Sequence, residues 1–278
     1  MKIAVVGNGH LATVYSVCLA HGGHTVNGPV FPSPLASEPR LAQLAQTAIE
    51  SGLLDCSCNT QDKDIVIVAW DTDVDPEDHA DTRPVLQDIY NVASGLRDGL
   101  IVIAAQLPVG FIAKCEKENP HVRFACCPEN LTRGNAVDRF LHADRIVCGI
   151  RRESDKAILI NLWEPFGRIE WMSIESAEMS KHAINAFLAT SICFANEIAE
   201  VARLHGADPR EVERALKSDS RIGQRAYLRP GEPYTGGTLG RDVRYLEQMT
   251  NELEFPLLNA VRASNDTHKA REAETVSQ

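Results

Sequence analysis

The chain opens with the stretch MKIAVVGNGHLA, residues 1–12, in which a short β-branched run leads into two glycines and then into an apolar helical pattern. A strand, a glycine turn and a helix in this order are typical of a dinucleotide-binding domain. Glycines let the backbone turn tightly and approach a pyrophosphate, and the N-terminus of the following helix offers N–H groups to it. We therefore expect the cofactor-binding turn to consist of Gly7, Gly9, His10, Leu11 and Ala12.

The second expected strand, residues 25–30, should end in an acidic residue that holds the ribose hydroxyls of NAD. Pro29, Val30 and Phe31 stand there instead, and no arginine follows at once to hold the 2′-phosphate of NADP. NAD is the expected cofactor, with NADP as the alternative. Either other groups hold the cofactor or the site has decayed.

Residues 64–70, DIVIVAW, form a continuous apolar run of the kind found in a central parallel strand. The loop that follows contains Asp71, Thr72, Asp73 and Asp75. Ligands of an open α/β sheet bind at the carboxyl ends of its strands, so this loop, including Thr72, is expected beside the cofactor. We interpret its carboxylates as a solvated acidic loop and expect no metal; a magnesium site is the alternative.

Strands and helices continue to alternate up to residue 172, which predicts an α/β fold with a Rossmann-like, doubly wound parallel sheet. The pattern then changes to helices alone, at residues 208–217, 242–253 and 256–265. We expect a dinucleotide-binding domain at residues 1–172, a central helix with a small all-helical dimerisation and substrate domain at residues 173–268, and a flexible tail at residues 269–278.

The longest helical pattern covers residues 175–205, ESAEMSKHAINAFLATSICFANEIAEVARLH. Its apolar residues run almost all the way round, which suits a helix buried between domains or subunits and predicts a homodimer. Lys181 and Asn185 stand one turn apart on one face, with Glu178 one turn before them, so an ammonium and an amide can converge on a small ligand. The simpler interpretation is a solvated Glu178–Lys181 ion pair and an interfacial Asn185.

Composition excludes several classes of protein. The net charge is −10, from 28 basic and 38 acidic residues, and no basic run is present, so nucleic acid is not an expected partner. We find no signal peptide and no apolar segment long enough to cross a membrane, and we interpret the eight cysteines as reduced thiols. These features predict a cytoplasmic protein.

Three long segments carry a resemblance to a known family: CPENLTRGNAVDRFLHADRIVCG at 127–149, SAEMSKHAINAFLATSICFANEIA at 176–199, and RIGQRAYLRPGEPYTGGTLGRD at 221–242. With matching order and spacing over residues 1–268, the chain resembles the UDP-glucose/GDP-mannose dehydrogenase family. The resemblance implies an N-terminal dinucleotide-binding domain, a long dimerising helix, and a C-terminal domain that completes a sugar-nucleotide site.

The resemblance also implies roles for individual residues. Gly7, Gly9 and Ala12 would face NAD. The sugar would be surrounded by the candidate catalytic residues Glu129, Lys181, Asn185 and Asp242. The substrate-binding loop, rich in glycine, would contribute Arg225, Tyr227, Gly236 and Gly237.

The chain differs from the family at positions where family members carry residues that take part in the reaction. Family members oxidise a sugar C6 alcohol twice, and the second oxidation needs a cysteine where this chain has Leu239. Arg241 replaces a lysine, and the turn Gln106-Leu107-Pro108 lacks the family's threonine. The sequence also stops where the family's C-terminal domain should start, so many of the residues that bind uridine diphosphate in the family are expected to be missing.

Three functions remain open. The first is a two-electron oxidation of an alcohol on a nucleotide sugar or sugar-like substrate, in which Lys181 polarises or deprotonates the hydroxyl and Asn185 holds its oxygen, as in the related β-hydroxyacid dehydrogenases. The second is a non-catalytic relative that binds a nucleotide sugar or a partner enzyme. The third, a four-electron dehydrogenase using Cys127, is the least favoured. We favour the first, because a purely structural protein has no need of all four sugar-facing residues.

Overall fold

The computed structural model describes residues 1–96, 99–249 and 256–276. The chain divides into two units. The sheet unit comprises Met1–Thr72 and Asp81–Lys181, and the helical unit comprises Asp73–Ala80 and His182–Gln278.

The sheet unit contains an eight-stranded sheet in the order β3-β2-β1-β4-β5-β6-β7-β8. All neighbouring strands are parallel except β6 and β7, which are antiparallel. The predicted Rossmann-like fold is confirmed, with this one reversal that the sequence pattern did not indicate. The strands are β1 Lys2–Gly7, β2 Thr25–Asn27, β3 Leu54–Asp55, β4 Ile65–Ala69, β5 Leu100–Ile103, β6 Arg123–Cys126, β7 Ala143–Ile150 and β8 Gly167–Met172.

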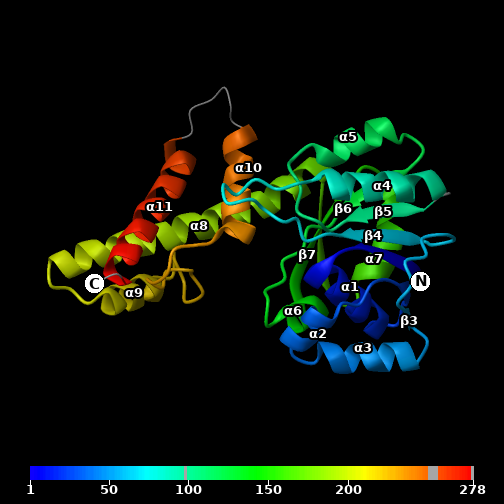
Figure 1. The fold of residues 1–278 in the computed structure, drawn as a ribbon, viewed down its shortest axis with the longest axis horizontal. Helices are drawn as coiled ribbons and strands as arrows, with labels where there is room; N and C mark the ends of the chain where they lie inside the picture. Colours follow the sequence, from blue (N-terminus) through cyan, green and yellow to red (C-terminus); the bar gives the residue numbers. More distant parts are fainter. Residues whose placement is uncertain (97–98, 250–255, 277–278) are drawn as a thin grey trace. The chain divides into compact units, whose positions relative to one another are not determined.

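Helices cover both faces of the sheet (Figure 1). Side chains alternate along a strand, so Ile65 and Ile67 of β4 belong to one core and Val66 and Val68 to the other. The first core includes residues of α1 Gly9–His21, α3 Leu41–Glu50, α6 Ala136–Leu141 and α7 Lys156–Trp163. The second includes residues of α4 Arg83–Gly95 and α5 Phe111–Glu118. Because both faces are covered, the central strands are apolar throughout.

The long predicted helix is α8, Ile174–Leu204, one residue from the expected bounds at each end. Its first turns, through Lys181, belong to the sheet unit, and the remainder belongs to the helical unit. The helical unit also contains α9 Pro209–Ser218, a π-helical turn at Gly236–Gly240, α10 Arg241–Met249 and α11 Pro256–Val276. Its core consists of apolar side chains, among them Ala189, Val243 and Val261.

The C-terminal segment differs from its prediction. Residues 269–276, expected as part of a flexible tail, continue α11, and residues 277–278 lie outside the described residues. The segment is rich in alanine, glutamate and lysine, which are strong helix formers, and His268 and Glu272 pair one turn apart. The predicted helix at 242–253 is α10, which ends at Met249 before undescribed residues.

Every helix among the described residues is too short or too polar to span a lipid bilayer.

Candidate functional site

The glycine turn between β1 and α1 leaves no space for side chains. Gly7 has φ +148°, and a Cβ on it would lie 1.9 Å from the carbonyl oxygen of Ala69. Gly9 has φ +61°, and a Cβ there would lie 3.0 Å from Asp71 Oδ2. The backbone thus turns as tightly as dinucleotide binding requires, and both glycines fit that role.

The N-terminus of α1 is occupied by a carboxylate of the chain itself. The N–H of Leu11 donates to Asp71 Oδ2 at 3.0 Å, and the N–H of Asp71 donates to Asn8 Oδ1 at 3.0 Å. Thr72, which follows Asp71, is buried. The first N–H groups of a helix lack partners within the helix and attract anions, so Asp71 accepts a bond that a pyrophosphate would otherwise accept.

Glu38 is a site residue that the sequence analysis missed. Its carboxylate accepts hydrogen bonds from the N–H groups of Gly134 and Ala136, and its Oε1 lies 2.7 Å from His10 Nε2. Burial raises the pKa of Glu38, but the bonds from Gly134, His10 and Ala136 outweigh burial and hold the pKa below its ordinary value. Glu38 therefore ties the glycine turn to the segment that leads into α6.

No acidic residue stands at the end of β2, which is shorter than the strand expected at residues 25–30. β2 ends at Asn27, and Pro29 and Val30 follow it. The carboxylate of Asp55, at the end of β3, already accepts hydrogen bonds from Asn27 Nδ2 and from the hydroxyl of Ser57, at 2.8 Å and 2.9 Å. The glycine turn therefore fits NAD, whereas the ribose position and the α1 terminus do not show the usual partners.

Lys181 and Glu129, two of the predicted catalytic residues, form an ion pair in the sheet unit. Lys181 Nζ lies 3.5 Å from Glu129 Oε1, and the two side chains are 9% and 15% exposed. The other oxygen of Glu129 accepts a hydrogen bond from the N–H of Leu131. The pair thus places a positive and a negative group together with little access to solvent.

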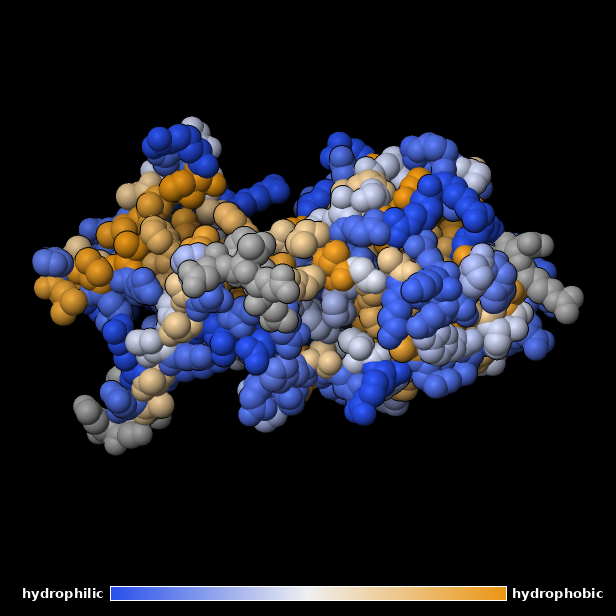
Figure 2. Space-filling view, turned by 90° about the horizontal axis from the view of Figure 1, so that it is seen from above, coloured by the Kyte–Doolittle hydropathy of each residue, from blue (hydrophilic) through white to orange (hydrophobic). Residues whose placement is uncertain are grey.

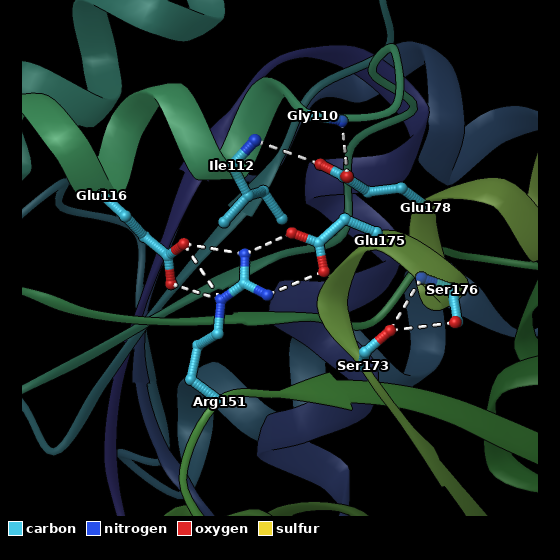
Figure 3. A network of polar contacts seen from close by, with 8 residues as sticks. All are labelled: Gly110, Ile112, Glu116, Arg151, Ser173, Glu175, Ser176 and Glu178. Carbon is cyan, nitrogen blue, oxygen red and sulfur yellow. Dashed lines mark hydrogen bonds and ion pairs between the residues drawn. The ribbon is translucent and has the colours of Figure 1, made fainter.

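The alternative of a solvated Glu178–Lys181 pair is wrong, because both residues are buried. Glu178 accepts hydrogen bonds from the N–H groups of Gly110 and Ile112, at 2.8 Å and 3.0 Å, at the start of α5 (Figure 3). In the same network the guanidinium of Arg151 bonds Glu116 and Glu175. These contacts fix the first turns of α8, and with them the backbone of Lys181, within the sheet unit.

Cys127, the proposed alternative nucleophile, is poorly placed for attack. It is 2% exposed, and its Sγ lies 3.2 Å from Sγ of the buried Cys148. Cys127 and Glu129 border a cavity of about 50 Å³, whose lining also includes aromatic, aliphatic and arginine side chains.

Asn185 and Asp242 meet in the helical unit. Asn185 Nδ2 donates to Asp242 Oδ2, and His182 Nδ1 lies 2.9 Å from Asp242 Oδ1. The guanidinium of Arg241 lies 3.9 Å from the same oxygen. All four residues are buried, and Asp242 has no exposed surface. The sequence analysis missed His182, although it follows Lys181 directly; its partner lies 60 residues further on, so no local pattern reveals it.

The other predicted substrate residues lie in the loop that leads to α10. Arg225 and Tyr227 are exposed, and so is Gly237, whereas Gly236 enters the π-helical turn. Leu239, at the position of the family's cysteine, packs against the core of the helical unit. The turn that contains Gly236 and Gly237 runs directly into α10, whose second residue is Asp242.

Among residues 1–96, 99–249 and 256–276, one group of potential metal ligands occurs, in the segment before α4. Asp75, Glu77 and His79 each offer one ligand atom within 4.8 Å of the others. The Asp75 carboxylate already accepts hydrogen bonds from the N–H groups of Glu77 and His79, and its other oxygen lies 3.1 Å from His79 Nδ1. Exposed acidic groups of this kind are common without an ion, and the absence of a metal stays a prediction.

Comparison with known proteins identifies both parts of the chain. Residues 33–167 match the NAD binding domain of the UDP-glucose/GDP-mannose dehydrogenase family, and residues 175–267 match the central domain of that family. The UDP-glucose 6-dehydrogenase YwqF of Bacillus subtilis is 31% identical over 301 aligned positions, which cover 97% of this chain and 67% of that protein.

Solved structures agree on the fold. A UDP-glucose dehydrogenase from the archaeon Pyrobaculum islandicum has a TM-score of 0.86 at 28% identity, covering 96% of this chain and 68% of its own. The 3-hydroxyisobutyrate dehydrogenase of Mycobacterium tuberculosis, at 16% identity, shares the fold with a TM-score of 0.71, covering 98% of this chain and 94% of its own. The chain thus spans about two thirds of the length of the sugar-nucleotide dehydrogenases it matches.

Proposed function

Because the chain belongs to the UDP-glucose/GDP-mannose dehydrogenase family, we propose that it is an NAD(P)-dependent oxidoreductase that removes two electrons from an alcohol of a nucleotide sugar or sugar-like substrate. The observation that carries the proposal is the ion pair of Lys181 with Glu129, 3.5 Å apart and shielded from solvent. A buried amine beside a carboxylate is suited to moving a hydroxyl proton.

The proposed chemistry converts an alcohol to a carbonyl. NAD, when bound, supplies the acceptor for the hydride that leaves the carbon. Lys181 acts as the base in its neutral amine form: its own proton passes first to Glu129, 3.5 Å away, and the amine then takes the hydroxyl proton. Asn185 lies four residues after Lys181 on α8, on the same side of the helix. Its amide nitrogen donates to Asp242, so its carbonyl oxygen is the group of Asn185 that can accept a hydrogen bond from another hydroxyl of the substrate.

Two observations support a reaction that stops at the carbonyl. The loop at residues 236–240 has Leu239 in place of a thiol, and a leucine cannot form a thiohemiacetal. Cys127 is buried against Cys148, which disfavours a four-electron mechanism through that thiol.

The test is turnover of the variant Lys181→Ala with a panel of UDP-sugars and GDP-mannose, followed by the appearance of NADH. We expect a loss of about 10²–10⁴-fold in kcat with an unchanged circular dichroism spectrum. Lys156→Ala is a matched control, since that lysine pairs with Glu153 at 2.8 Å in the same unit and should retain full activity. Unchanged activity of Lys181→Ala would sink the role assigned to it.

A second candidate is a non-catalytic protein that binds a nucleotide sugar or a partner enzyme. The contact of Asp71 with the α1 terminus favours it, because that contact competes with the cofactor. Under this alternative the wild-type protein binds UDP-sugars in calorimetry but produces no NADH with any of them.

We also propose a homodimer that pairs through α8. Phe187, Phe194 and Val201 follow one another at intervals of seven residues and are 71%, 46% and 52% exposed. Figure 2 shows hydrophobic side chains gathered on one side of the helical unit. Apolar residues repeating every seven positions along a helix suit a second helix packed against it. A cytoplasmic location is proposed as well, because all eight cysteines are free thiols.

A further inference from the structure

We propose that Asp71 is a built-in competitor for the cofactor, whose carboxylate occupies the pyrophosphate position at the N-terminus of α1 and holds the affinity for NADH low. The inference rests on the proposed function in that it concerns the same cofactor site. It assigns to this chain a residue that sets cofactor affinity.

Asp71 is held at the α1 terminus by two hydrogen bonds of opposite direction. Its carboxylate accepts from the N–H of Leu11, and its own N–H donates to Asn8 Oδ1, both at 3.0 Å. Asn8 is the residue before α1, and its side chain does not cap the helix. The loop after β4 therefore supplies the cap that the helix otherwise lacks.

The glycine turn is shaped around this carboxylate. A Cβ at Gly9 would lie 3.0 Å from Asp71 Oδ2, and Gly9 adopts φ +61°. The space that this glycine leaves open, which lets a dinucleotide approach the backbone, is filled here by Asp71. The next residue of the turn, His10, is likewise bound by a carboxylate, since its Nε2 lies 2.7 Å from Glu38 Oε1.

Competition follows from the chemistry of the two anions. A carboxylate and a pyrophosphate both accept hydrogen bonds from the N–H groups at a helix N-terminus and both gain from its positive dipole end. Two anions at one terminus repel each other, so a dinucleotide must displace Asp71 and then remain close to its charge. The displacement of Asp71 and the repulsion from its charge both weaken the binding of the dinucleotide.

The experiment compares NADH binding, by calorimetry without any sugar nucleotide, in the wild type and three variants. Asp71→Asn removes the charge and keeps the shape, and Asp71→Gly removes the competing side chain altogether. Asp73→Asn is the matched control, because this exposed residue lies two positions further along the same loop. Thermal unfolding confirms that each variant is folded.

We expect Asp71→Asn and Asp71→Gly to bind NADH at least tenfold tighter than the wild type, a difference of about 1.4 kcal/mol, and Asp73→Asn to bind like the wild type. If Asp71 acts only as a helix cap, its variants lose thermal stability and bind no tighter, which would overturn the proposal. Equal gains for the Asp71 and Asp73 variants would overturn it too, since they would reflect net charge alone. Because binding is measured without substrate, the result is independent of the Lys181 turnover test.

Discussion

Replacement of Asp242 by alanine should destabilise the helical unit strongly. Asp242 has no exposed surface, and its two oxygens meet His182 Nδ1 and Asn185 Nδ2, both on α8. Alanine leaves these two buried polar groups without their acceptor, at a cost of about 1–3 kcal/mol for each group. The expected loss in the free energy of unfolding is therefore about 4 kcal/mol, within the range of about 3–5 kcal/mol typical of a broken buried pair.

The assay is urea unfolding followed by circular dichroism. With a urea dependence of about 3 kcal/mol/M, a loss of about 4 kcal/mol lowers the midpoint by about 1.3 M. Asp266→Ala is the control, since that side chain is 58% exposed and pairs with Lys269 at 3.5 Å on α11 of the same unit. A surface pair of this kind contributes less than about 1 kcal/mol. Equal midpoints for the two variants would refute the argument that a buried polar network holds α10 to α8.

Other predictions rest on separate features of the chain. Phe187→Glu should convert the proposed dimer to a monomer in size-exclusion chromatography with light scattering, because it places a charge among the exposed apolar residues of α8; a wild-type monomer at micromolar concentration would contradict the proposed dimer. Only Cys56 and Cys58 are exposed, so a chromogenic disulfide reagent should titrate two thiols in the native protein and eight in denaturant; more than two in the native state would contradict the burial of the others. The pKa of Glu38 lies below its ordinary value of 4.5, so its ionised form stabilises the fold above pH 4.5, and this contribution is lost as the pH falls through the lowered pKa. The difference in stability between wild type and Glu38→Gln should therefore shrink below pH 4.5, and a difference that grows with acid would show the opposite sign.

Elements with a strong local pattern were predictable from the sequence. The run at residues 64–70 is β4, Ile65–Ala69, because a strand buried on both faces must be apolar at every position. α8 was predicted to within one residue at each end, since a pattern of this length and apolar character is typical of a long buried helix. The glycine turn was recognisable because the tight turn and close packing at Gly7 and Gly9 admit no side chain.

Contacts between distant parts of the chain were not predictable in this way. Asp71 reaches Leu11 across 60 residues, and His182 reaches Asp242 across 60 residues. Glu38 bonds Ala136 across 98 residues. From the sequence alone, a carboxylate next to a strand is interpreted as solvent-exposed, because the donor that would bind it in the folded protein comes from a distant segment. The sequence therefore indicated which charged residues belong to the site, but it did not indicate which residues they contact.

These contacts also change which residues are evidence for catalytic activity. The family resemblance predicts that Asp242 and Asn185 face the sugar, but in this chain they also form the buried hydrogen-bond network of the helical unit with His182. Their presence therefore has a structural explanation and does not distinguish an enzyme from a binding protein. The Lys181–Glu129 pair is different, because burying an ion pair is often no more stabilising than burying apolar side chains of similar volume. A protein without catalytic activity would therefore lose little by replacing both with apolar residues, and so the catalytic proposal depends on this pair.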